Sequence, residues 1–275
     1  RRILCRGLKR RENCAIIPIY RQKEYNASEG HIMPRFFMAG TNILGGMAIM
    51  RGRDAEHVHV LRMRPGEDMI ICDGQGTDYK CRLVKADKEQ VEAEVIEVVR
   101  CPAEPNVKVT VLCGLPKGDK TDYIIQKCVE AGAYEILFFA SSRCIAKLGN
   151  EEKKLERWQR IAEEAAKQSG RGIIPQVGWA GELADAFDAA VKKDVGLFMY
   201  ETGEREALNG VLEANKTVET AAIITGPEGG FAPFEAELAK IVGLHICSMG
   251  ERILRCETAP VVALTAAMYA TGNLA

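Results

Sequence analysis

The chain contains the stretch A-A-I-I-T-G-P-E-G-G-F at residues 221–231, where an apolar run ends in a glycine-rich turn. A short apolar run without polar alternation is typical of a strand buried on both faces of a parallel sheet. A second β-like run, at 245–248, leads into the loop G-E-R-I-L-R-C-E-T-A at 250–259. Open α/β sheets bind their ligands at the carboxyl ends of their strands. The two loops therefore predict a ligand site at one end of such a sheet.

The residue types in these loops indicate the kind of ligand. The glycines of 226–230 allow positive φ angles and close approach of the backbone to a ligand, but ordinary strand-to-helix turns use glycine in the same way. The second loop adds Arg252, Arg255 and Glu257, which form either a solvated charge cluster or the wall of a polar site. Three charges on a tight loop beside a glycine-rich loop favour a polar ligand.

Strands alternate with helices from residue 107 onward. Apolar runs predict strands at 107–111, 136–140, 195–200, 221–225 and 244–247. Helical spacing predicts one helix that begins near Thr121 and another over 155–165. A further helix follows the second loop, with Thr258 suited to its N-cap and Pro260 to its first turn. This order predicts a parallel sheet with helices on both faces.

The preceding part of the chain has a β pattern. Apolar and polar residues alternate over 79–83 and 91–95, with glycine turns between short runs, which predicts a small barrel. Prolines 102 and 105 indicate a linker. We therefore expect a β domain over 33–101 and an α/β domain over 106–275.

Residues 1–32 carry eight basic and three acidic side chains and show no sustained periodicity. Such a segment is either a disordered tail, or sequence translated upstream of a start at Met33, or a basic arm that binds RNA. We expect a tail or upstream sequence.

The overall composition excludes several classes of protein. Because the net charge is −1, any contact with nucleic acid must use local basic patches. No apolar run approaches the roughly 20 residues of a membrane helix, so no membrane span is expected. The ten cysteines form no C-x-x-C pair and do not group with the four histidines at zinc-ligand spacing. We expect no metal site, and the cysteine pattern favours a reducing cytoplasm.

One loop resembles a phosphate-binding P-loop and is excluded by its details. The stretch G-L-P-K-G-D-K-T at 114–121 resembles that motif, but Asp119 stands where the motif requires glycine. An acidic side chain at this point repels the phosphate that the loop would hold. We therefore reject a nucleotide triphosphatase.

Several segments together resemble one enzyme family. They are L-P-K-G-D-K (115–120), I-I-Q-K-C-V-E-A-G (124–132), K-L-E-R-W-Q-R-I-A-E-E-A (154–165), Q-S-G-R (168–171), I-T-G-P-E-G-G-F (224–231) and M-G-E-R-I-L-R-C-E-T-A (249–259). In this order they resemble the bacterial ribosomal RNA small-subunit methyltransferase E family, of the SPOUT class. M-P-R-F-F (33–37) and H-V-L-R-M-R-P-G-E (59–67) resemble its PUA-like domain. The resemblance extends from about residue 33 to 275.

The resemblance implies an α/β fold in which the parallel sheet is tied in a trefoil knot, preceded by a small PUA-like β-barrel. It implies a cytoplasmic, S-adenosylmethionine-dependent enzyme that methylates N3 of one uridine in the 16S rRNA of the small ribosomal subunit, acting as a homodimer. Cys256 departs from the family, which usually has threonine there, and Glu251 stands where proline or a neutral residue is frequent.

The cofactor residues that the resemblance implies lie in three loops. They are Met199, Tyr200, Glu201, Thr225, Gly226, Pro227, Glu228, Gly229, Gly230, Ser248, Met249, Gly250, Ile253, Leu254, Arg255 and Thr258.

Methylation of a uracil N3 requires a base or stabilisation of the negative charge that develops on O2 and O4. We expect Arg255 to stabilise this charge, as a preorganised cationic donor does. Glu257 is either the base, or the group that orients Arg255, or a counter-charge to a helix N-terminus. Arg171 is expected to reach the same pocket mouth.

Basic side chains in both domains are the candidates for RNA contact, although basic residues are also common on any solvated surface. They are Arg35, Arg51, Arg53, Arg62, Arg64, Lys117, Lys120 and Arg143. Two rival functions remain at this point: a SPOUT methyltransferase that acts on another RNA, and a non-catalytic RNA-binding assembly factor.

Overall fold

The computed structural model describes residues 33–38, 43–87 and 89–274, so the prediction for 1–32 lies outside the described residues. The described chain divides into two compact units. The first holds most of 38–70 and all of 79–99, and the second holds 35–37, 71–78 and the chain from 100 onward. Of the ten cysteines, the eight that are described are free thiols. No helix in the described ranges is long and apolar enough to cross a membrane.

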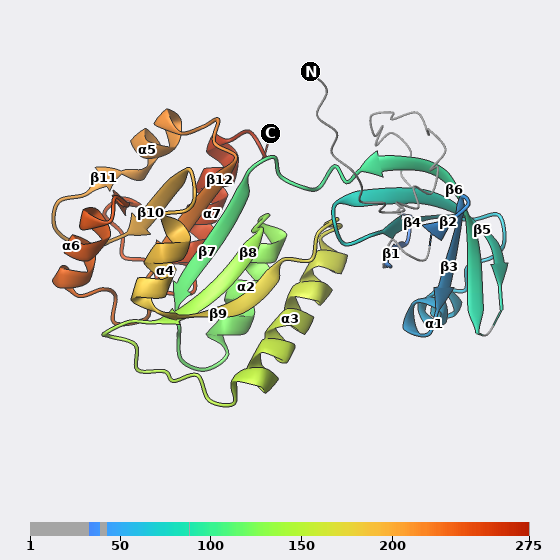
Figure 1. The fold of residues 1–275 in the computed structure, drawn as a ribbon, viewed down its shortest axis with the longest axis horizontal. Coiled ribbons are helices and arrows are strands. Elements are labelled where there is room, and N and C mark those ends of the chain that lie inside the picture. Colours follow the sequence, from blue (N-terminus) through green and yellow to red (C-terminus); the bar gives the residue numbers. More distant parts are fainter. Residues whose placement is uncertain (1–32, 39–42, 88, 275) are drawn as a thin grey trace, which may run out of the picture. The chain divides into compact units, whose positions relative to one another are not determined.

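The N-terminal part forms a curled six-stranded sheet (Figure 1). Its strands are β1 (Arg35–Phe37), β2 (Ile43–Leu44), β3 (Met47–Arg51), β4 (Asp68–Cys72), β5 (Thr77–Ala86) and β6 (Gln90–Arg100), in the order β1-β4-β5-β6-β3-β2. The predicted alternation is confirmed in β6, where Val91, Ala93 and Val95 are all buried. Helix α1 (Arg53–Val60), which buries Ala55 and Val58, was not expected from the β pattern.

Strand β5 follows the predicted alternation only in part. Cys81 and Leu83 are buried, but Tyr79 is only half-buried. Asp78, the residue before Tyr79, is buried, and its carboxylate is paired with the guanidinium of Arg35. A buried ion pair therefore lies at the start of this strand.

The second unit contains a seven-stranded sheet in which every pair of neighbouring strands is parallel. Its strands are β7 (Lys108–Gly114), β8 (Glu135–Ala140), β9 (Gln176–Glu182), β10 (Val195–Met199), β11 (Glu206–Ala207), β12 (Thr220–Thr225) and β13 (His245–Ser248), in the order β11-β13-β10-β12-β7-β8-β9. The five predicted strands are confirmed. The two strands that were not predicted, β9 and β11, are the outermost strands, which are less buried and therefore carry no continuous apolar run.

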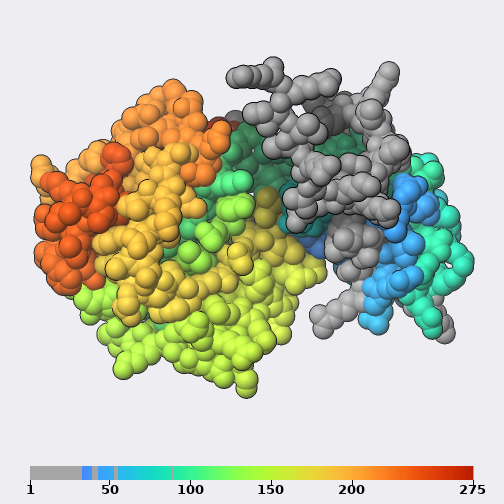
Figure 2. All heavy atoms as spheres, in the orientation of Figure 1, coloured from blue at the N-terminus to red at the C-terminus, as the bar shows by residue number. Residues whose placement is uncertain are grey.

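Helices cover both faces of this sheet, as predicted (Figure 1). On one face lie α2 (Lys120–Glu130), α3 (Glu151–Gln168), α5 (Leu208–Ala214) and α7 (Ala259–Ala270). On the other lie α4 (Leu183–Ala190) and α6 (Pro233–Ile241). The space-filling view shows α4, α5 and α6 on adjoining parts of the surface of this unit (Figure 2).

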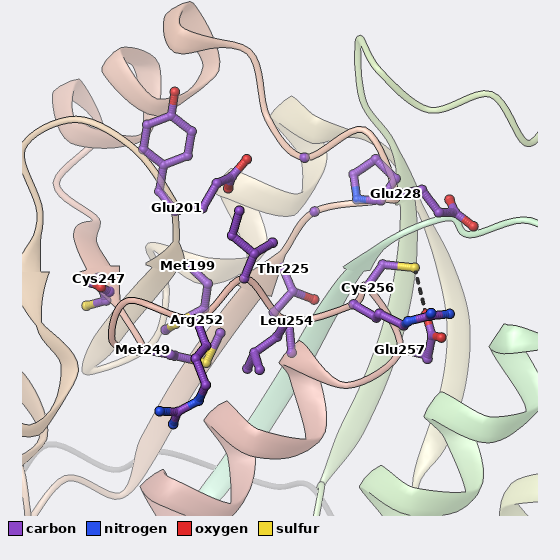
Figure 3. A pocket seen from close by; sticks show the side chains of 18 of the residues that line it. Met199, Glu201, Thr225, Glu228, Cys247, Met249, Arg252, Leu254, Cys256 and Glu257 are labelled. Carbon is purple, nitrogen blue, oxygen red and sulfur yellow. Dashed lines mark hydrogen bonds between the residues drawn. The ribbon is translucent and has the colours of Figure 1, made fainter.

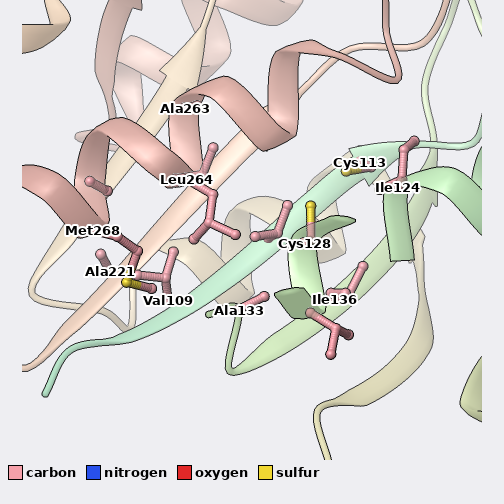
Figure 4. Close-up of a cluster of buried hydrophobic side chains, with 14 of the residues drawn as sticks. Val109, Cys113, Ile124, Cys128, Ala133, Ile136, Ala221, Ala263, Leu264 and Met268 are labelled. Carbon is pink, nitrogen blue, oxygen red and sulfur yellow. The ribbon is translucent and has the colours of Figure 1, made fainter. Parts of the chain in front are cut away.

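The two faces of the sheet have separate apolar cores. On the α7 face, Leu264 and Met268 pack with Val109 of β7 and Cys128 of α2 (Figure 4). On the α4 face, Phe198 of β10 packs with rings such as Phe231, at 4.2 Å between centroids. Successive residues of β7, β10 and β12 alternate between these cores, so neither face of the central strands offers room for a polar site.

Parallel pairing brings the ends of four strands together. Thr225 of β12 lies beside Cys113 of β7, and Met199 of β10 lies beside Cys247 of β13. The loops that follow these strands consequently leave the sheet at neighbouring points on its carboxyl end. Helix α7 begins after Thr258, which occupies the predicted N-cap position without a capping hydrogen bond from its side chain.

Candidate functional site

A pocket of about 350 Å³ lies at the carboxyl end of the parallel sheet. Its walls come from the loops after β10, β12 and β13 and from the start of α2. Figure 3 shows Met199, Cys247 and Met249 on one side of the pocket and Glu228 and Glu257 on the opposite side. The two segments that decided the fold class are therefore parts of one cavity.

Two glycines permit the loops to approach each other this closely. A Cβ atom on Gly114 would lie 2.5 Å from Cδ of Pro227 and 2.6 Å from its backbone nitrogen, so no other residue fits without moving the loop. Gly230 has φ of +61°, and a Cβ there would lie 2.4 Å from Oε1 of Glu201. Gly114, the first residue of the P-loop-like stretch, is thus required for close packing against the loop that carries Pro227.

The pocket gathers nearly all of the expected cofactor residues. Of the positions given above, only Gly229 and Thr258 do not line it. Gly229 faces Arg143, whose Nη1 donates to its carbonyl at 3.2 Å and to that of Phe231 at 2.9 Å. The lining also includes Lys120, Arg205, Cys247, Arg252, Cys256, Glu257 and Ala259. Sequence reasoning had no signal for Arg205, which lies outside every motif and donates to the carbonyl of Glu201 at 2.7 Å.

An ammonium and two carboxylates form one rim of the pocket. Nζ of Lys120 lies 2.9 Å from Oε1 of Glu228 and 3.5 Å from Oε2 of Glu257. The thiol of Cys256 lies between them, 3.6 Å from Lys120 Nζ, and donates to Glu257 Oε2 at 3.2 Å. Glu228 also accepts from the backbone N–H of Lys117 at 3.0 Å.

This arrangement keeps both glutamates ionised. Partial burial raises their pKa values, but the hydrogen bonds and the Lys120 charge together have the larger, opposite effect. Both pKa values therefore lie below the ordinary range. Lys120 and the Lys117 amide donate to Glu228, and Glu257 receives its own backbone N–H, the Cys256 thiol and the Lys120 charge. Burial raises the pKa of Cys256 to about 12, and the hydrogen bond to Glu257 adds to the effect, so this thiol stays protonated at neutral pH.

The arginines of the second loop are available to a ligand. The exposed Arg252 and Arg255 both line the pocket, and their guanidinium groups make no hydrogen bond or ion pair with any described residue. Glu257 is paired with Lys120, and no described contact joins it to Arg255. Glu257 therefore pairs with Lys120, and no contact in the described ranges supports its predicted role of orienting Arg255.

The structure corrects the expectation for Arg171, which does not line the pocket. Its side chain is 3% exposed and forms a two-pronged ion pair with Glu104, at 2.8 and 3.1 Å. Its Nη1 donates to the carbonyls of Val129 and Ala133, at the end of α2. Glu104 also accepts from the backbone N–H groups of Gly172 and Ile173. Arg171 of the Q-S-G-R motif thus connects Glu104 of the linker with the end of α2 through buried hydrogen bonds.

The candidates for RNA contact divide into groups. Arg62, Arg64 and Lys117 are exposed, and Arg51 is exposed and bonded to Gln90. Arg35 is largely buried against Asp78, so it is not a surface cation and the expectation for it was wrong. Arg53 lies at the start of α1, and its side chain is outside the described residues.

Comparison with known proteins agrees with this geometry. Residues 103–268 match a family model described as an RNA methyltransferase domain, and residues 51–96 match an RNA methyltransferase PUA domain. The chain is 37% identical over 227 residues to the ribosomal RNA small subunit methyltransferase E of Bacillus subtilis, covering 80% of this chain and 89% of the relative. It is 34% identical to that of Mesomycoplasma hyopneumoniae, covering 75% and 88%.

A solved structure extends the likeness to the fold. The ribosomal RNA small subunit methyltransferase E of Neisseria gonorrhoeae, bound to S-adenosyl methionine, is 31% identical and has a TM-score of 0.76, covering 86% of this chain and 97% of its own. Fold and pocket thus define an RNA methyltransferase domain of the SPOUT type preceded by a PUA-like sheet. The chain belongs to the ribosomal RNA small subunit methyltransferase E family.

Replacing Arg171 with alanine is expected to destabilise the fold strongly. The change leaves the Glu104 carboxylate buried without its cation, which typically costs about 3–5 kcal/mol. Urea unfolding of both proteins measures the difference. The exposed pair of Lys167 with Glu163 is the control, since Lys167→Ala is expected to cost less than about 1 kcal/mol. Equal losses of unfolding free energy in the two variants would show that the buried ion pair of Arg171 with Glu104 does not stabilise the fold.

Replacing Gly114 with alanine is expected to weaken cofactor binding at least about tenfold, because the new methyl group must displace the loop that carries Pro227. Gly210→Ala is the control, since a Cβ there meets nothing within 4 Å and the position lies in helix α5. Calorimetric titration with S-adenosylmethionine measures both variants. Unchanged affinity in Gly114→Ala would contradict the close packing of the loops.

Proposed function

We propose that this chain transfers the methyl group of S-adenosylmethionine to N3 of one uridine in 16S rRNA of the small ribosomal subunit. The observation that carries the proposal is the single pocket into which the sheet gathers three loops. Members of the same family are named for small-subunit ribosomal RNA, and one was solved with S-adenosyl methionine bound.

The pocket residues fit this cofactor. S-adenosylmethionine carries a positive sulfonium, a positive amino group and a negative carboxylate, and the lining contains both signs of charge. Arg205, Arg252 and Arg255 are cationic, and Glu201 is anionic. The backbone of Gly226–Gly230 offers close approach to the ligand. The described residues contain no group of side chains that could hold a metal ion.

The residues of the pocket explain how a uracil could react. When bound, the cofactor would supply an electrophilic methyl group to N3, and the N3 proton would pass to Glu257 or to solvent water. Arg255 stabilises the negative charge that develops on the uracil oxygens, because its guanidinium is otherwise unpartnered. Glu257 is an ionised but weak base, since its pKa is lowered. Holding the two reactants in line contributes a large part of the rate.

RNA contact uses the exposed cations. The exposure of Arg51, Arg62, Arg64 and Lys117 supports this role, and phosphate contacts make binding fall steeply with salt. The functional domains are residues 33–101 for RNA contact and 106–275 for methyl transfer, and the Pro102 and Pro105 linker supports this division.

The protein acts as a cytoplasmic homodimer with a knotted chain path. Exposed apolar side chains on α7 support the dimer, since Val262 is 40% and Tyr269 75% exposed. Family membership supports the knot and the location.

Incubation with labelled S-adenosylmethionine and unmethylated small subunits, followed by mass spectrometry of nucleosides, tests the function. Formation of 3-methyluridine is expected. A different methylated nucleoside would support action on another site or RNA, and failure to bind the cofactor at all would revive the assembly factor.

Replacing Arg255 with alanine is expected to reduce turnover by about 100-fold or more, because an unpartnered cation facing the reacting base is lost. Cofactor affinity should change less than about fivefold, since Arg205 and Arg252 remain in the pocket to meet the carboxylate of the cofactor. Single-turnover kinetics and calorimetric titration measure the two quantities. Full activity in Arg255→Ala would remove this residue from the mechanism.

A further inference from the structure

We propose that Lys120, which the sequence places among the RNA contacts, is instead a positioning residue of the methyl-transfer site. It joins Glu228 of the loop after β12 to Glu257 of the loop before α7 and so holds two walls of the pocket in one arrangement. The inference rests on the proposed function and deepens it.

The geometry of three chain segments carries the inference. Lys120 is the first residue of α2, Glu228 belongs to the glycine-rich loop, and Glu257 precedes α7. One ammonium nitrogen lies within 3.5 Å of a carboxylate oxygen from each loop. The backbone N–H of Lys117 also donates to Glu228, so the turn before α2 and the first residue of α2 both hold Oε1 of this carboxylate. Lys120 is the side chain that extends the link to Glu257.

The two acidic partners of Lys120 distinguish the cluster from a simple surface ion pair. Lys120 is 33% exposed, Glu228 30% and Glu257 18%, so water screens the pair with Glu257 less than it screens a pair on the open surface. A lysine that serves an RNA phosphate would be expected to point into solvent without a fixed partner. Lys120 has two acidic partners, so a phosphate would have to compete with both.

Removing the ammonium leaves two carboxylates facing each other. Glu228 and Glu257 would then repel, and the neutral Cys256 thiol beside them could not replace the lost charge. Arg255 is an unpaired cation two positions before Glu257 in the same loop, and any move toward the glutamates would take it from the reacting base. Both consequences displace groups at the reaction centre.

The test compares variants of the whole chain on unmethylated small subunits with S-adenosylmethionine. Lys120→Met is expected to lower kcat about 10- to 100-fold, as small misplacements at a reaction centre do, with KM for RNA changed less than about threefold. Lys120→Arg keeps the charge and should keep kcat within about threefold of wild type. Thermal unfolding confirms that each variant is folded.

Two other lysines supply the comparison. Lys127, also on α2, lies 2.9 Å from Glu130 but lines no part of the pocket, so Lys127→Met should keep the wild-type kcat and KM. Lys117→Met removes an exposed cation and should raise KM and reduce the salt slope of RNA binding by about 0.7–0.9. If Lys120→Met behaves like Lys117→Met, with kcat intact, Lys120 is an RNA contact and the inference is overturned.

The pH dependence of kcat separates a positioning role of Lys120 from a loss of folded protein. The ammonium helps to hold the pKa values of Glu228 and Glu257 low, so both stay ionised as the pH falls. In Lys120→Met these pKa values rise, and the acid limb of kcat moves to higher pH. Carbon NMR titration of the two carboxylates measures the same rise without turnover. Unchanged carboxylate pKa values would refute the positioning role even if 3-methyluridine never forms, whereas absence of that product alone refutes only the proposed function.

Discussion

The parallel pairing of β12 with β7 on one side and β10 on the other is the constraint on which the rest of the site depends. Each of these strands is buried on both faces, so polar groups can gather only where the strands end. The register places Thr225 beside Cys113 and extends through β10 to β13, which brings three loops and the start of α2 to one point. The pocket follows from this pairing, and the loops supply its chemistry.

Close approach of the loops is the second requirement. Gly114 ends β7 and Pro227 lies in the loop after the neighbouring strand β12, and their contact leaves no space for a Cβ atom on Gly114. Across this contact the Lys117 amide and the Lys120 ammonium reach Glu228. The segment 114–121, which resembles a P-loop, is therefore a wall of a different kind of site. The turn before its helix binds the carboxylate of Glu228 and not a phosphate.

Much of the fold was predictable because its signals are local. Buried central strands carry continuous apolar runs, and the helix patterns that flank them are clear. The outer strands β9 and β11 were missed because partial burial leaves no such run. Arg171 was misplaced for a different reason: a motif in the sequence does not show whether an arginine meets a substrate or a buried carboxylate such as Glu104. Arg35 was misplaced in the same way by its hidden partner Asp78.

The sequence by itself determined the class of fold, the two loops of the pocket and the family, because these depend on short apolar runs, glycines and motifs that are contiguous in the chain. Only the tertiary structure decided which charges meet. Lys120 and Glu228 are 108 positions apart, and nothing in either segment indicates the other. Ion pairs of this kind depend on where strands end in space, so the partners of Lys120, Arg171 and Arg35 could be assigned only after the sheet had brought their segments together.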